Sequence, residues 1–398
     1  MDSLPLDITL NIFSRLPFVS FIHCNRVSKS WHALLKHPQL QQAFLESQNN
    51  LCLILHCSSS CSPQDQIFLV NNCSHLNNDD DHWKDIMKIN IPLKNHKFSS
   101  VSNCKGFLFL SYNESNNKLV VYNKICVYNI YTAELTHLPG SHLVIKGFKV
   151  AYGFGFHPRT KEYKVVRIVE QECVRYYFGQ YELSLDQSIE VFTLGTYAWR
   201  TKRSNPFLLR MQTIEALING ALHWLGQAKV RHSQIILSFD LEDERFYQIP
   251  SPNCRFDVLD WHLLVLGGCL SLAVYNHNKK NKIDIWLMKN YDMKESWTKE
   301  FTINSGSLSL GSIRPLCLLK NDKVLFEYAK QSLFLYDTNK KTTKKINLGD
   351  FPYYFQAVPM SKLSIQQGLS SVCTLKPLEE TASCRLTFGV CMYLIKAI

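Results

Sequence analysis

One strand pattern recurs along the chain at a nearly constant spacing, and this spacing constrains the fold more than any other feature. In each copy, a short run of β-branched and aromatic residues leads to an aromatic anchor and is followed by polar turn residues. The anchors are Tyr128, Phe192, Phe239, Trp286 and Tyr336, which are separated by 64, 47, 47 and 50 residues. A second strand-like run precedes each anchor, at residues 106–110, 163–168, 220–224, 268–272 and 323–327.

Repeats of this length, each with about four strands, are typical of kelch-type β-propellers, whose radial blades leave only short edges. Further strand-like runs at Leu51–Leu55 and Gln66–Val70 precede the first copy, and Phe351–Leu375 is a candidate closing strand. The pattern therefore predicts an all-β propeller-like domain of hairpin repeats with six or seven blades. A pair of β-sandwiches or an irregular barrel built from the same hairpins is the alternative.

Several local signals add detail to this domain. The long step between the first two anchors contains Glu170–Asp186, a polar and aromatic stretch that predicts an extended hairpin or an inserted loop. Pro158–Lys161 and Asn219–Gly220 have the composition of hairpin turns. We expect Gly153 and Gly155 to permit close backbone approach, because glycine has no Cβ.

The first 45 residues follow a helical rather than a strand spacing. Three helices are predicted: the first ends at Pro17, the second covers about Val19–Arg26, and the third covers about Ser28–His37 and is closed by Pro38. Ser3 is a candidate cap of the first helix, with Pro5 in its opening turn and Asp7 near its positive end. That helix is apolar on two sides, and a module of this size buries too little surface to be stable alone. Either a second protein or the rest of this chain must therefore cover each side. The two rows are formed by Ile8, Ile12 and Leu16 and by Leu6, Leu10 and Phe13.

This N-terminal module resembles the F-box, the adaptor-binding module of SCF-type ubiquitin ligases. The resemblance rests on Leu4-Pro5-x-Asp7-Ile8, Ile12–Pro17, Arg26–Trp31 and Pro38. It implies that the module binds the Skp adaptor and, through it, cullin and RING subunits. The residues that would contact the adaptor are Leu4, Pro5, Ile8, Ile12, Leu16, Val27 and Trp31.

The module also departs from the family pattern in a few positions. His23 and Asn25 in the second helix, and Ser28 before the third, differ from the residues common in the family. Trp31 has a second interpretation, because a tryptophan in a short apolar segment is often a core residue. We expect its truncation to damage folding and binding together.

The β domain resembles the F-box-associated domain of plant F-box proteins. The resemblance rests on the ordered series Tyr152–Val166, Asn219–Trp224 and Ser238–Glu244, within a match of about Val101 to Lys345. It predicts a multidomain chain in which a small all-α three-helix module precedes the all-β domain. The predicted boundaries are 1–45 for the F-box, 46–50 for a linker, 51–375 for the β domain and 376–398 for a divergent C-terminal tail.

Composition excludes several classes of protein. With 46% hydrophobic and 19% charged residues the chain is not a disordered one, and its net charge of +11 favours anionic partners without indicating nucleic acid. The N-terminal residues do not have the pattern of a secretory signal, and no apolar stretch is long enough to span a membrane. Because no secretory signal is found, we expect the chain inside a cell, in the cytoplasm, the nucleus or both. In such a chain, 14 cysteines without a CxxC pair are expected to be buried thiols.

No motif for catalysis or for a cofactor is found. The sequence has no GxSxG, no phosphate-binding loop and no HExxH, and His223 is expected to be a hydrogen-bonded core residue. The cysteine and histidine spacings between Cys52 and His75 do not match zinc fingers, so we expect no metal site. Three basic clusters lie between strand patterns and are expected at hairpin tips, where they would form an anion-binding face only if they converge. They are Lys94–Lys97, Lys279–Lys282 and Lys340–Lys345.

The sequence thus predicts a non-catalytic substrate-recognition subunit of an SCF-type ubiquitin ligase. Its F-box would bind the adaptor, and its β domain would bind a protein target for ubiquitination at residues that the sequence does not identify. The alternative is a stand-alone propeller that reads a glycan or RNA and has a non-functional F-box-like segment.

Overall fold

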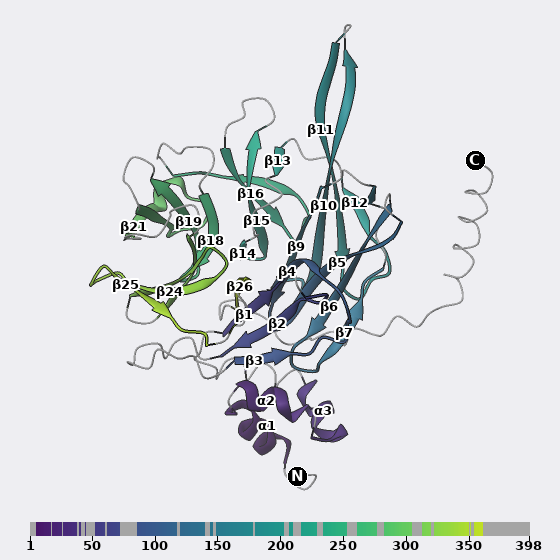
Figure 1. The fold of residues 1–398 in the computed structure, drawn as a ribbon, viewed down its shortest axis with the longest axis vertical. Helices are drawn as coiled ribbons and strands as arrows, with labels where there is room; N and C mark the ends of the chain where they lie inside the picture. Colours follow the sequence, from purple (N-terminus) through teal and green to yellow (C-terminus); the bar gives the residue numbers. More distant parts are fainter. Residues whose placement is uncertain are drawn as a thin grey trace, which may run out of the picture.

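In the described part of the chain, the short helices α1, α2 and α3 are followed by a six-bladed β-propeller (Figure 1). The computed structural model describes residues 5–360 with gaps at 17, 26, 38–39, 41–43, 45–51, 60–61, 72–85, 118–119, 140–143, 146–148, 178–179, 203–206, 210–215, 229–233, 253–260, 277–281, 305–312, 320–321, 350 and 352–353. The predicted linker 46–50 and the predicted tail 376–398 lie outside the described residues.

Six antiparallel sheets of four or five strands form the blades, each of which runs from an innermost strand outward. Blade 1 contains β26 (Phe355–Met360), β1 (Cys52–Cys57), β2 (Gln66–Val70) and β3 (Ile86–Ile89). Blade 2 contains β4 (Phe98–Cys104), β5 (Phe107–Asn117), β6 (Val120–Asn129) and β7 (Glu134–His137), with β8 (Val144–Ile145) paired to β6. Blade 3 contains β9 (Lys149–His157), β10 (Glu162–Tyr177), β11 (Gln180–Thr193) and β12 (Arg200–Lys202).

The second half of the ring follows the same order. Blade 4 contains β13 (Phe207–Leu209) and β14 (Ala216–Ile218), which both pair with β15 (Ala221–Ala228), and then β16 (Gln234–Asp240) and β17 (Phe246–Ile249). Blade 5 contains β18 (Trp261–Leu266), β19 (Cys269–Asn276), β20 (Lys282–Met288) and β21 (Trp297–Asn304), with the short helix η2 (Lys294–Ser296) before β21. Blade 6 contains β22 (Ile313–Leu319), β23 (Lys323–Tyr328), β24 (Ser332–Asp337) and β25 (Thr342–Ile346).

The predicted repeat is confirmed, and the sandwich and barrel alternatives are wrong. Every aromatic anchor lies in the third strand of a blade, and the run that precedes it lies in the second strand. The pattern therefore detected the central hairpin of blades 2 to 6. Two shorter strands flank each hairpin, and the contacts between innermost strands of neighbouring blades close the ring.

The last of the described strands belongs to the first blade. β26 pairs antiparallel with β1, with Leu53 opposite Pro359, and confirms the closing strand expected between residues 351 and 375. Blade 6 also contacts this strand, because the Arg314 guanidinium donates to the Glu327 carboxylate at 2.7 Å and to the Ala357 carbonyl at 2.5 Å. The Glu327 carboxylate in turn accepts the Ala357 N–H at 2.7 Å.

The residues between the first two anchors form an extended hairpin, as one of the two sequence interpretations expected. β10 and β11 are paired from Lys164–Thr193 to Tyr177–Gln180. This hairpin projects from one end of the molecule, and the helices lie at the opposite end (Figure 1).

Apolar clusters fill the spaces between adjacent blades, as the alternation of side chains across each strand requires. Gly153 and Gly155 of β9 face blade 4 at close range, as predicted. An added Cβ would lie 2.5 Å from the Trp224 ring at Gly153 and 2.7 Å from Leu241 at Gly155. Asn219 and Gly220 both have positive φ and join β14 to β15 in the predicted tight turn.

Candidate functional site: an apolar strip on the N-terminal helices

The three helices form where the sequence predicts them. They are α1 (Leu6–Ser14), α2 (Phe18–Cys24) and α3 (Lys29–Leu35). Pro5, whose carbonyl accepts the Thr9 N–H at 3.1 Å, occupies the cap position of α1 that was expected for Ser3. The Ser28 hydroxyl accepts the Trp31 N–H at 3.2 Å and so caps α3.

One side of the helical module docks on the propeller. Phe13, Phe21 and Leu35 are at most 1% exposed and belong to the apolar cluster that extends into blades 1 and 2. Phe21 stacks on Phe44 with ring centroids 3.7 Å apart, and both rings meet Tyr131 edge-on at 6.1 and 6.4 Å. Tyr131 lies in the turn between β6 and β7. The module therefore docks on this turn.

Polar contacts fasten the module to the same turn. The Asn25 amide donates to the Thr132 carbonyl at 2.6 Å, and its oxygen contacts the His32 ring. The Lys36 ammonium lies 2.5 Å from the Glu134 carboxylate. Partial burial alone raises the pKa of Glu134, but hydrogen bonds from Lys36 and Thr132 outweigh it and hold that pKa below its usual range.

These contacts were not predicted from the sequence. Asn25 is one of the departures from the family pattern, and in the structure it joins the module to the propeller. A polar residue at an otherwise apolar docking face was the available signal, but its partner is 107 residues away in the chain.

The other side of the module remains open to solvent. Ile8 is 45% exposed, Ile12 41% and Val27 60%, and Pro5 is also exposed. We call Pro5, Ile8, Ile12 and Val27 the apolar strip. Several large aliphatic side chains with such high exposure are typical of a surface that a partner protein covers.

The remaining predicted contact residues divide differently. Leu16 and Trp31 are half-buried and pack against the same cluster as Phe13, and the Trp31 ring meets the Phe13 ring edge-on at 4.9 Å. Trp31 therefore supports the module and also presents part of its surface. Leu4 lies outside the described residues.

The comparisons with known proteins fit this arrangement. Residues 1–44 match the family model described as F-box-like, and residues 52–368 match the model described as F-box associated beta propeller domain. This chain belongs to the F-box proteins with an F-box associated β-propeller domain. It is similar to F-box protein At3g07870 of Arabidopsis thaliana, with 31% identity over 90% of each chain. It is also similar to F-box protein CPR1 of the same plant, with 26% identity over 90% of this chain and 87% of the other.

Among solved structures, TolB from Acinetobacter baumannii has a TM-score of 0.43 to this F-box protein, with 10% identity over 84% of this chain and 72% of the other.

His223, expected from the sequence to be a core histidine, has that role in the structure. Its ring is fully buried, with Nδ1 3.1 Å from the Ala216 carbonyl and Nε2 2.6 Å from the Tyr291 hydroxyl. Burial lowers the pKa of His223 to about 4 and outweighs those backbone contacts, so the ring is neutral at pH 7.

The candidate metal ligands of the sequence do not form a cluster within the described part of the chain. Cys52 and Cys57 are buried thiols of β1, and burial raises the pKa of Cys57 to about 12. The His56 Nε2 lies 2.8 Å from the Asp65 carboxylate. Cys61, Cys73 and His75 lie outside the described residues.

The basic clusters do not converge on one face, and the expectation that all three are hairpin tips is wrong. Lys94–Lys97 lies on the connection from β3 to β4, between two blades, whereas Lys340 and Lys341 form the turn from β24 to β25 and Lys344 and Lys345 lie within β25. Because successive strands of a blade run in opposite directions, these two connections emerge on opposite faces of the ring. Of the third cluster, residues 279–281 lie outside the described residues.

The described residues contain no helix that is long and apolar enough to cross a membrane.

Proposed function

We propose that this F-box protein is the target receptor of an SCF-type ubiquitin ligase, and that the apolar strip binds the Skp adaptor. The observation that carries the proposal is the division of the first helix. Phe13 is buried in the apolar cluster shared with the propeller and Leu10 packs against that cluster, while Ile8 and Ile12 stay exposed. The propeller of the same chain thus covers one apolar side of the module, and the other side remains available to a partner. The adaptor would connect the chain to cullin and RING subunits.

No residue of this chain needs to react in such a role. The propeller would hold a protein target, and the adaptor side would hold the subunits that transfer ubiquitin, so that an encounter between free proteins becomes an intramolecular one. The receptor would work in the cytoplasm, the nucleus or both, where those subunits are available to it.

The test is capture of the purified adaptor by the full chain. The double substitution Ile12→Asp and Val27→Asp places two charges where apolar surface must be buried, and each exposed side chain contributes roughly 1.5–3 kcal/mol when covered. We expect the affinity for the adaptor to fall at least about 100-fold. Both positions are exposed in the free chain, so the fold and the thermal unfolding midpoint should be unchanged.

Tyr197→Asp is the matched control, because Tyr197 is 76% exposed but lies on the propeller, between β11 and β12. It should leave adaptor capture unaltered. Equal capture by the double variant and the unsubstituted chain would refute the proposed role of the strip.

A further inference from the structure

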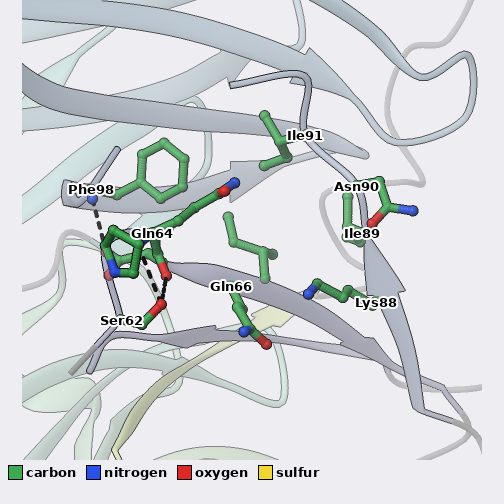
Figure 2. A pocket seen from close by; sticks show the side chains of 11 residues that line it. Ser62, Gln64, Gln66, Lys88, Ile89, Asn90, Ile91 and Phe98 are labelled. Atoms are coloured by element: carbon green, nitrogen blue, oxygen red, sulfur yellow. Dashed lines mark hydrogen bonds between the residues drawn. The ribbon is translucent and has the colours of Figure 1, made fainter. Parts of the chain in front are cut away.

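A cavity of about 350 Å³ opens beside blade 1, on the face of the ring opposite the helices. Its walls are the connection from β1 to β2, the strands β2 and β3, and the connection from β3 to β4 (Figure 2). Both connections emerge on the same face, whereas the helices sit on the turn from β6 to β7, which emerges on the other. An occupant of this cavity would therefore leave the apolar strip free.

The cavity walls are held in place by contacts between segments distant in sequence. The Asp65 carboxylate accepts the Phe98 N–H at 2.8 Å and contacts His56 Nε2 at the same distance. The Gln64 side chain donates to the Leu93 carbonyl at 2.8 Å, and the Asp65 N–H donates to the His96 carbonyl at 3.0 Å. These bonds fix the connection from β3 to β4 over blade 1, so the cavity exists before any ligand arrives.

The solvent-exposed charges at the cavity are all positive. Lys88, on the exposed side of β3, forms no ion pair with a described residue, and Figure 2 shows its side chain directed toward Gln66. Lys94 and Lys97 are exposed on the adjacent connection. Asp65 is the only carboxylate among the 11 lining residues, and its side chain is 1% exposed and already bonded to His56.

The remaining lining residues are apolar or have amide groups, apart from Ser62, whose hydroxyl donates to the Gln64 carbonyl at 2.7 Å. Ile67, Ile89 and Phe98 are buried side chains whose surfaces contribute to the wall. The side-chain amides of Gln66 and Asn90 have no hydrogen-bond partner among the described residues and can bond a peptide backbone. A ligand that matches the lysine, the apolar wall and the amides is extended, with an anionic group next to an apolar one.

We propose that this cavity is the target-binding site and that it takes an extended peptide segment with an anionic side chain next to an apolar one. Lys88 binds the anion, the Ile67, Ile89 and Phe98 wall contacts the apolar side chain, and the amides bond the backbone. A volume near the lower end of roughly 300–1,000 Å³ for ligand pockets holds a short segment of a target and not a folded surface. The identity of the ligand as a target rests on the proposed function.

The test selects random nonapeptides from a displayed library on the full chain. We expect the recovered peptides to contain Asp or Glu within two positions of an aliphatic or aromatic residue. The variant Lys88→Glu should bind those peptides about tenfold more weakly, because a charged hydrogen bond is lost and a repulsion is added. In its own selection Lys88→Glu should recover basic residues at the same position, which a merely structural role of Lys88 would not produce.

Lys340→Glu is the control for net charge, because Lys340 is an exposed lysine on the opposite face of the ring, in blade 6, and it should recover the same peptides as the unsubstituted chain. Synthetic versions of one recovered peptide with Glu, phosphoserine or Gln at the acidic position, measured by fluorescence polarisation, show whether a carboxylate or a phosphate is the better anion. Failure to recover acidic peptides, or identical recovery by Lys88→Glu, would overturn the proposal. Adaptor capture measured on the same preparations separates this result from the fate of the proposed function.

Discussion

Glu244 joins blade 4 to blade 3, and its replacement should weaken the propeller in a way that depends on pH. Glu244 lies in the turn from β16 to β17, and its side chain is 7% exposed. Its carboxylate accepts from the Lys164 ammonium at 3.0 Å and from the Lys202 ammonium at 2.5 Å, and it also contacts the Arg200 guanidinium. Three cations from blade 3 thus surround one carboxylate from blade 4.

The size of the effect follows from the pKa of this carboxyl. Burial alone raises the pKa of Glu244, but hydrogen bonds from Lys202, Arg200 and Lys164 outweigh it and lower the pKa from 4.5 to about 2. A folded-state pKa below the unfolded one stabilises the fold above the unfolded pKa, and this contribution is lost as the pH falls toward the folded value. It amounts to about 3 kcal/mol at pH 7 and about 1.5 kcal/mol at pH 3.

Urea denaturation of Glu244→Gln at a series of pH values measures this contribution. We expect the variant to be less stable than the unsubstituted chain by about 3 kcal/mol at pH 7, and the difference to shrink by about half at pH 3. Glu300→Gln is the matched control, because Glu300 pairs with Lys289 at 2.6 Å on the exposed surface and should contribute less than about 0.5 kcal/mol. A difference for Glu244→Gln that is the same at both pH values would contradict the electrostatic explanation.

Two further substitutions test the ring itself. Arg314→Ala leaves the buried Glu327 carboxylate without its cation at the junction of blades 6 and 1. It should lower the free energy of unfolding, measured by urea denaturation, by about 3 kcal/mol. An unchanged urea midpoint would show that β26 is held by its backbone pairing alone. Gly153→Ala places a methyl group 2.5 Å from the buried Trp224 ring and should cost about 1–3 kcal/mol in thermal denaturation, and full stability would mean that blades 3 and 4 separate without penalty.

The spacing of aromatic residues was sufficient to predict the central hairpins of the propeller, because those strands are buried and strongly patterned. Tyr128 and Phe239 lie in third strands, and both side chains are almost fully buried between blades. The outermost strands are harder to predict, since β12 has three residues and β25 is almost entirely polar. Their position depends on backbone pairing with a neighbour and not on an apolar pattern of their own.

The sites depend on contacts between residues that are distant in the sequence. Two apolar rows on the first helix were visible in the sequence, but the sequence did not show which row the propeller would cover. Phe13 of one row joins an apolar cluster that includes Tyr131, in the turn of blade 2, and these two residues are far apart in the chain. The cavity of blade 1 was not predicted at all. Its walls require His56, Asp65 and Phe98 to meet, and only the pairing of strands brings them together.

Because β26 closes the ring, blade 1 can be completed only late in the synthesis of this protein. Blade 1 contains the cavity and contributes to the apolar cluster under the helical module, yet its innermost strand is the last of the described strands to be synthesised. Until residue 360 has emerged, β1 has an unpaired inner edge and the ring is incomplete. A chain cut short before that strand would still contain the helices, but blade 1 would lack its innermost strand.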